Sequence, residues 1–146
     1  MISRAELVVN AVNGKVLDVG YVSGDLHNSI RKKISGKNLF GLDTHVKKQT
    51  KNHRKGTAEK IPFEKNYFDC VVAGELIEHV KKPALFLKEA NRVLKNNGLL
   101  IITTPNKKSL INRVFHSYET KYHISLFSKK ELGKALEKNK FKVIKT

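Results

Sequence analysis

Short apolar runs, each closed by glycine or aspartate and followed by a stretch with helical spacing, constrain this fold more than any other feature. Val16–Val19 runs into glycine, Leu39–Asp43 ends in aspartate, and residues 68–73 are again followed by glycine. Runs this short and apolar are typical of strands buried on both faces of a sheet. Strands that alternate with helices imply right-handed crossovers. We therefore predict an α/β fold with a Rossmann-like, mostly parallel sheet and helices on both faces.

Three segments between or after these strands have residue patterns that predict helices. Residues 25–34 repeat a leucine or isoleucine every four positions, which indicates an amphipathic helix. Pro83 suits the first turn of a second helix, which we expect the glycine at position 98 to stop. Ser128 and the glutamate three residues later form a capping box, so a third helix should run to about residue 138.

The rest of the chain divides into two further expected strands and one expected loop. Residues 99–104 and 141–144 have the apolar character of strands. Residues 44–60 are polar and basic without an apolar period, so we expect a loop with at most one helical turn. In such folds ligands bind outside the carboxyl ends of the strands, where the strand order reverses.

Length and composition favour one cytoplasmic domain. The 146 residues fit a single domain of ordinary size, residues 1–146. Cys70 is the only cysteine, which excludes an internal disulfide, and no spacing of cysteine or histidine suggests a metal site. The first residues lack the apolar core of a signal peptide, and no stretch approaches the roughly 20 apolar residues of a membrane span. We therefore expect no metal, no membrane span and a cytoplasmic location.

The chain is strongly basic, with 29 lysines and arginines against 13 acids and a net charge of +16. Such a field attracts nucleic acids, anionic substrates or acidic membrane surfaces. Most of these residues are lysines, however, and a lysine-coated soluble surface explains the composition equally well. The same two interpretations apply to the basic run in the expected loop, Lys47, Lys48, Lys51, Arg54 and Lys55.

A glycine turn follows the first expected strand. Gly20 and Gly24, just after Asp18, would let the backbone turn tightly and approach a ligand closely. A nicotinamide-cofactor fingerprint needs G-x-G-x-x-G, which this spacing does not supply, so we disfavour an oxidoreductase. A tight turn without a ligand is the simpler alternative.

Asp43 strengthens the case for a ligand. It closes the second expected strand, about 20 residues beyond the glycine turn. A carboxylate there can accept hydrogen bonds from both hydroxyls of a ribose. The two features together favour a nucleoside-binding crevice more than either does alone.

These features belong to a longer, ordered set of motifs that resembles the methyltransferase type 11 family of class I S-adenosylmethionine-dependent methyltransferases. The resemblance spans roughly residues 15–141. It rests on the glycine turn with VLDVG at 16–20, Asp43, GTAEKIPF at 56–63, YFDCVV at 67–72, EHV at 78–80, RVLK at 92–95, GLLI at 98–101 and TPN at 104–106.

The resemblance implies an enzyme that transfers a methyl group from S-adenosylmethionine to an unidentified acceptor and leaves S-adenosylhomocysteine. It implies four groups of cofactor-binding residues. These are Asp18, Gly20, Tyr21 and Gly24 around the methionine moiety, Asp43 and Thr44 at the ribose, Thr57, Ala58 and Glu59 at the adenine, and Ala73, Gly74 and Glu75 along the floor.

The sequence departs from the family pattern at several points. Val22 stands where the family usually has a second glycine, Tyr21 replaces a small residue, and Thr57 replaces an aspartate. The sequence also stops where the family usually adds an antiparallel strand, so we expect a minimal or C-terminally truncated methyltransferase core. These departures keep a second hypothesis open, an inactive methyltransferase-like domain that acts as a basic nucleic-acid- or protein-binding module.

No fixed catalytic group can be assigned, because the sulfonium itself supplies the reactivity. His79 is a candidate base, although a structural role fits the family better. Tyr118, Tyr122 and His123 lie where the family builds its substrate side. Cys70, inside an expected buried strand, is not expected to be a nucleophile.

Overall fold

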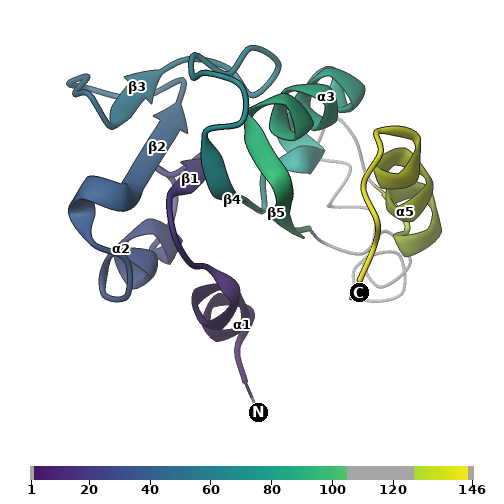
Figure 1. The fold of residues 1–146 in the computed structure, drawn as a ribbon, viewed down its shortest axis with the longest axis horizontal. Coiled ribbons are helices and arrows are strands. Elements are labelled where there is room, and N and C mark those ends of the chain that lie inside the picture. The colour runs from purple at the N-terminus through teal and green to yellow at the C-terminus, as the bar shows by residue number, and fades with distance from the viewer. Residues whose placement is uncertain (1, 105–126, 145–146) are drawn as a thin grey trace, which may run out of the picture.

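A single parallel sheet organises the computed structural model, which describes residues 2–104 and 127–144. Its strand order is β3-β2-β1-β4-β5, and every neighbouring pair is parallel (Figure 1). The strands are β1 (Val16–Val19), β2 (Leu39–Asp43), β3 (His53–Lys55), β4 (Phe68–Gly74) and β5 (Leu94–Thr103). The α/β prediction with a mostly parallel sheet is confirmed. The order reverses at β1, so the expected crevice lies at the carboxyl ends of β1 and its neighbours.

Helices cover both faces of the sheet, as predicted. On one face α1 (Arg4–Ala11) and α2 (Leu26–Arg31) pack on alternate side chains of β1 and β4. On the other face α3 (Pro83–Val93) and α5 (Lys129–Lys138) pack on the intervening ones. Two short 3-10 turns, η1 (Gly36–Asn38) and η2 (Ile77–His79), complete the described elements. The alternation follows because successive side chains of a strand point to opposite faces.

Local signals explain where the helices begin. Ser128 accepts from the backbone of Glu131, whose carboxylate accepts from Ser128, so the predicted capping box starts α5. Ser3 and Glu6 form the same box at α1. The sequence analysis predicted no helix there, because Val8 is the only buried residue of α1. Among the described residues no helix is long and apolar enough to cross a membrane.

The expected loop over residues 44–60 contains a strand, so that prediction is wrong in part. β3 pairs with β2 in the register Gly41 with His53, Leu42 with Arg54 and Asp43 with Lys55. It is an edge strand with a polar sequence and partial exposure. Alternating apolar residues are not required there, because only one strand adjoins it and no full face is buried.

Two further expectations about element ends are also wrong. α3 ends at Val93 rather than at the glycine of position 98, because Leu94 already pairs with β4 and Asn97 has a φ of 61°. Residues 141–144 form no strand, since no ladder hydrogen bonds join this described segment to the sheet. Lys140, with a φ of 66°, turns the chain out of α5 just before that segment.

Candidate functional site

Asp43 is the point at which the expected cofactor segments meet. Its side chain is 9% exposed, and its two carboxylate oxygens accept backbone N–H bonds from Val22 (Oδ2, 3.0 Å) and His45 (Oδ1, 2.8 Å). Its carbonyl accepts the N–H of Gly56 at 3.1 Å. The end of β2 therefore holds the glycine turn on one side and the 56–59 segment on the other, which is the grouping that the sequence predicted.

The glycine turn has the backbone that only glycine adopts without strain. Gly20 has a φ of 81° and donates its N–H to the Leu42 carbonyl at 2.7 Å. A Cβ on Gly20 would lie 2.9 Å from the side chain of Leu76, whereas one on Gly24, at a φ of 99°, would meet nothing within 4 Å. The turn is thus closely packed at its first glycine and open at its second.

Val22, where the family usually has glycine, contributes its backbone to this turn. The N–H of Val22 binds Asp43, and its side chain is 47% exposed. The isopropyl group therefore does not fill a closed cavity. Because the hydrogen bond comes from the main chain, it does not require glycine at this position.

Tyr21 is partly buried and packs its ring against two histidines. Its ring centroid lies 4.6 Å from that of His27 and 5.1 Å from that of His53. A Cβ on Gly41 would lie 2.5 Å from the Tyr21 ring, so the ring rests directly on the backbone of β2. Burial is the main cause of the raised Tyr21 pKa, and the negative charge of Asp43 adds to it. The large residue is accommodated because β2 has no side chain at position 41.

Hydrogen bonds connect three polar side chains near the turn: Asp18 and His27, which are buried, and His53, which is partly buried. Asp18 Oδ2 lies 3.0 Å from His27 Nδ1, and His27 Nε2 lies 3.0 Å from His53 Nε2. Asp18 is 3% exposed and His27 4%. Burial raises the pKa of Asp18, and the hydrogen bond from His27 opposes that shift. Burial also lowers the pKa of His53, with smaller effects from His27 and Arg31.

The Asp18 carboxylate is therefore engaged with His27 and lies out of contact with solvent. Sequence reasoning missed both histidines. No motif signals them: His27 is an ordinary position near the start of α2, and His53 lies in a strand that the sequence analysis expected to be loop.

The expected adenine segment is a tight turn bridged between Thr57 and Lys60. Thr57 is exposed, and its hydroxyl makes no hydrogen bond with the described part of the chain. Ala58 packs into the core, and Glu59 accepts the N–H of Lys82 at 3.4 Å. The departure from aspartate therefore leaves a hydroxyl that faces outward beside the end of β2.

Arg92 holds the chain just after this turn. Its guanidinium donates to the carbonyls of Ile61 (2.8 Å) and Phe63 (2.9 Å) and to the carboxylate of Glu89 (2.7 Å). Glu89 in turn accepts the N–H of Ile61. These bonds lower the pKa of Glu89 and raise that of Arg92. The RVLK motif of the sequence analysis thus has a positioning role here.

The end of β4 borders the turn through Leu76, which packs on Gly20. A Cβ on Gly74 would lie 2.7 Å from the side chain of Leu26, and Glu75 follows in a left-handed conformation, with a φ of 50°. The Glu75 carboxylate pairs with Arg4 of α1 at 2.8 Å. Ala73 is fully buried, so its side chain belongs to the core. The expected floor therefore consists of backbone and the Glu75 side chain.

His79 and Glu78 lie in the same segment. Glu78 is 1% exposed and accepts the hydroxyl of Thr104 at 3.0 Å, and His79 Nε2 lies 3.9 Å from the Glu78 carboxylate. His79 is 42% exposed. Tyr118, Tyr122 and His123, the other expected acceptor-side residues, lie outside the described residues. Cys70 is 1% exposed, and burial raises its pKa to about 12, as expected of a core thiol.

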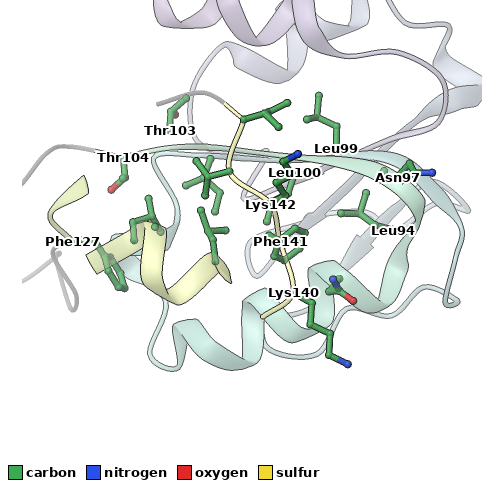
Figure 2. Close-up of a pocket in the computed structure, with 18 of the residues that line it drawn as sticks. Leu94, Asn97, Leu99, Leu100, Thr103, Thr104, Phe127, Lys140, Phe141 and Lys142 are labelled. Carbon is green, nitrogen blue, oxygen red and sulfur yellow. The ribbon is translucent and has the colours of Figure 1, made fainter. Parts of the chain in front are cut away.

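A further hollow lies away from this site, along β5. A cavity of about 860 Å³ is lined by β5, α5 and residues 140–144, with Leu100, Phe127 and Phe141 among its walls (Figure 2). It adjoins the β5 edge, two strands away from the glycine turn. In the described ranges no group of three or more histidine, cysteine or acidic side chains could hold a metal ion.

Comparison with protein families gives one match over almost the whole chain. A family model described as a methyltransferase domain matches residues 2–146. The ubiquinone biosynthesis O-methyltransferase of Pelagibacter ubique is 32% identical over 106 residues, covering 65% of this chain and 43% of that protein. The demethylmenaquinone methyltransferase of Thermotoga maritima is 27% identical, covering 77% and 54%. The chain thus spans less than two thirds of the length of these curated relatives.

Solved structures show the same fold. An S-adenosylmethionine-dependent methyltransferase of Thermotoga maritima superposes with a TM-score of 0.74 at 23% identity, over 95% of this chain and 70% of that one. The Haloferax volcanii methyltransferase solved with the Trm112 activator also gives 0.74, at 19% identity, over 92% and 65%. At these identities the similarity shows the Rossmann-like methyltransferase fold.

Proposed function

Because the chain belongs to the methyltransferase domain family, we propose that it binds S-adenosylmethionine and transfers its methyl group to an acceptor. The observation that carries this proposal is the convergence on Asp43 of the glycine turn and the 56–59 segment. An inactive, purely binding module explains less well why the carboxylate, the glycine turn and the 56–59 segment all meet at the end of β2.

The residues at this point fit an adenosyl group. Each Asp43 oxygen accepts one backbone N–H and keeps a second lone pair, so the carboxylate can also accept two ribose hydroxyls. Open space at Gly24 leaves the turn approachable. The Thr57 hydroxyl beside the end of β2 can accept a hydrogen bond from an amino group, although less strongly than the usual aspartate.

We assign the roles as follows. Asp43 and Thr44 hold the ribose, Thr57 to Glu59 flank the adenine, and the backbone of Gly20 to Gly24 and of Ala73 to Glu75 surrounds the methionine end. Asp18 and Tyr21 position the turn through their packing with His27. When bound, the sulfonium of S-adenosylmethionine supplies an electrophilic methyl group. The protein has to align the acceptor and exclude water, and no proton-transfer residue is required for every acceptor.

The names of the relatives narrow the acceptors to test first. One is named as an O-methyltransferase of ubiquinone biosynthesis, and the other as a methyltransferase of demethylmenaquinone. Phenolic and quinol rings are therefore the first panel, and for a phenolic oxygen His79 is the candidate base. A cytoplasmic location and a single domain over residues 1–146 stay predictions from composition and length.

Isothermal titration calorimetry with S-adenosylhomocysteine tests the proposal. We expect saturable binding, and Asp43→Ala should weaken it by at least about 10- to 100-fold, since the loss of even one hydrogen bond to a charged group costs about 1.5–3 kcal/mol. Asp25→Asn is the matched control, because Asp25 is exposed and makes no side-chain cap bond. Thermal melting of both variants without ligand separates lost binding from lost folding. Absence of heat and of thermal stabilisation at millimolar ligand would sink the proposal.

A further inference from the structure

A group of exposed basic side chains lies along the β3 edge of the sheet, and none of them has an acidic partner in the described part of the chain. We call them the β3-edge cations. None of these side chains takes part in an ion pair or hydrogen bond there. They are Arg31, Lys32, Lys37, Lys47, Lys48, Lys51 and Lys55.

Two neighbouring basic residues are excluded because their charged groups are already engaged. Lys33 donates to the carbonyls of Val9 and Asn10 at 2.8 and 2.9 Å. Arg54 donates to a backbone carbonyl and stacks on Phe63, 4.6 Å from the ring centroid. Lys33 and Arg54 therefore bind other parts of the protein, whereas the charged groups of the β3-edge cations are exposed to solvent.

Hydrogen bonds hold together the segments that carry Lys37 and the cations from Lys47 to Lys55. Asn52 donates to the carbonyls of Gly36 and Lys37, which fixes the β2–β3 loop against η1. Gln49 accepts the N–H of Lys55, which fixes the same loop to β3. Arg31, at the end of α2, contributes after burial and His27 to lowering the pKa of His53, so it lies within electrostatic reach of β3. Figure 1 shows α2, β2 and β3 at one end of the molecule and α5 at the other.

The local charge balance leaves this surface uncompensated. Asp43 is the only acid between Arg31 and Lys55, and it is 9% exposed with both oxygens bonded to backbone N–H groups. Some exposed cations elsewhere do have acidic partners, such as Arg4 with Glu75 and Lys95 with Asp69. A concentrated positive field next to the end of β2 therefore attracts a partner with closely spaced negative charges.

We propose that the β3-edge cations bind the phosphate backbone of a nucleic acid. Phosphates are favoured because Lys and Arg alternate here with Asn, Gln and Thr side chains, the residues that contact phosphate and sugar. A membrane surface is disfavoured because the large exposed apolar residues, Ile2, Leu7, Val22, Leu85 and Ile144, all lie outside this surface. Because most of the cations are lysines, which bind phosphate as point charges, the binding is independent of sequence.

Fluorescence anisotropy with a labelled, mixed-sequence RNA of about 20 nucleotides tests this proposal on the full chain. The variant combines Lys47→Gln, Lys48→Gln, Lys51→Gln and Lys55→Gln. Counterion release of about 0.7 per phosphate contact predicts that these changes reduce the slope of log K against log salt by up to about 3. The matched control removes the same charge from α5, with glutamine at Lys129, Lys130, Lys134 and Lys138, which are also exposed.

The proposal expects the β3-edge variant to lose affinity and salt slope while the α5 variant keeps both. Equal losses in the two variants would overturn it, because net charge alone would then explain the binding. Failure of the native chain to bind RNA at about 50 mM salt would overturn it as well, as would binding to phosphatidylglycerol vesicles in its place. Because the RNA assay contains no cofactor, its result is independent of the methyltransferase proposal. Circular dichroism melts show whether both variants fold.

Discussion

Replacing His27 by leucine tests whether the hydrogen-bonded side chains of Asp18, His27 and His53 hold the glycine turn in place. His27 Nδ1 is the only described partner of the Asp18 carboxylate, at 3.0 Å, and both side chains are almost fully buried. Leucine fills a similar volume but has no donor. The substitution therefore leaves a carboxylate buried without a hydrogen bond, with little change in packing volume.

The expected loss of stability has a ceiling set by protonation. A buried pair that loses one partner typically costs about 3–5 kcal/mol. Asp18 can instead take up a proton. Protonating a carboxyl group with an ordinary pKa of 3.8 at about pH 7 costs about 1.4 kcal/mol per pH unit above that pKa, or about 4 kcal/mol. At about pH 5 the same arithmetic gives a ceiling of about 1.6 kcal/mol. Because the folded-state pKa is raised, the variant's stability is lost as pH rises and recovered as pH falls.

Urea unfolding followed by circular dichroism at about pH 7 and pH 5 measures this difference. We expect His27→Leu to lose about 3–4 kcal/mol at the higher pH and less than half of that at the lower. The double variant Asp18→Asn with His27→Leu is the control, because it has no carboxylate to protonate and its deficit should not follow this pH dependence. A loss below about 1 kcal/mol at pH 7, or one that does not shrink on acidification, would refute the reasoning.

Four shorter predictions follow from other contacts. Gly41→Ala would place a methyl group 2.5 Å from the Tyr21 ring, so it should lower the free energy of unfolding by about 1–3 kcal/mol. The same substitution made in a Tyr21→Ala background should cost less, and an equal cost in both backgrounds would contradict the contact. Arg92→Lys loses the fork that holds residues 61–63, so urea unfolding should show a loss of about 2–3 kcal/mol and calorimetry a weaker affinity for S-adenosylhomocysteine. The hydrogen bond from the Lys15 N–H lowers the pKa of Asp69 below 3.8, so the Asp69 carboxylate stabilises the fold above that pH and loses this effect as the pH falls below it. The stability of Asp69→Asn should therefore fall less steeply on acidification than that of the native protein. Cys70 should react with a thiol reagent only as fast as the chain unfolds, and rapid labelling of the native protein would contradict its burial.

The sequence predicts the central strands well because burial on both faces leaves a strong signal. β1 and β2 are buried at every residue, and their bounds match the apolar runs. β3 has no such signal, since its pairing with β2 rather than its own composition defines it. α1 escapes prediction for a related reason: its capping box is clear, but most of its apolar side chains are exposed.

The candidate site divides in the same way. Asp43 and the glycine turn are recognisable because strand ends and positive-φ glycines recur at fixed places in parallel α/β folds. The bond between His27 and His53 depends on how α2 and β3 pack, and these residues are 26 positions apart. No local sequence pattern indicates that contact, so the sequence analysis considered His27 and His53 only as possible metal ligands.

Tyr21 and Val22 depart from the family pattern of the glycine turn, but the packing around them accommodates both side chains. Gly41 leaves room for the Tyr21 ring, and the imidazole of His27 both stacks on that ring and binds Asp18. Val22 contributes an N–H to Asp43 and projects its side chain outward. The shape of the turn therefore depends on partners in β2 and α2 rather than on a further glycine. It follows that restoring glycine at position 22 alone should leave cofactor affinity nearly unchanged, whereas disrupting His27 should weaken it, although His27 lies beneath the turn.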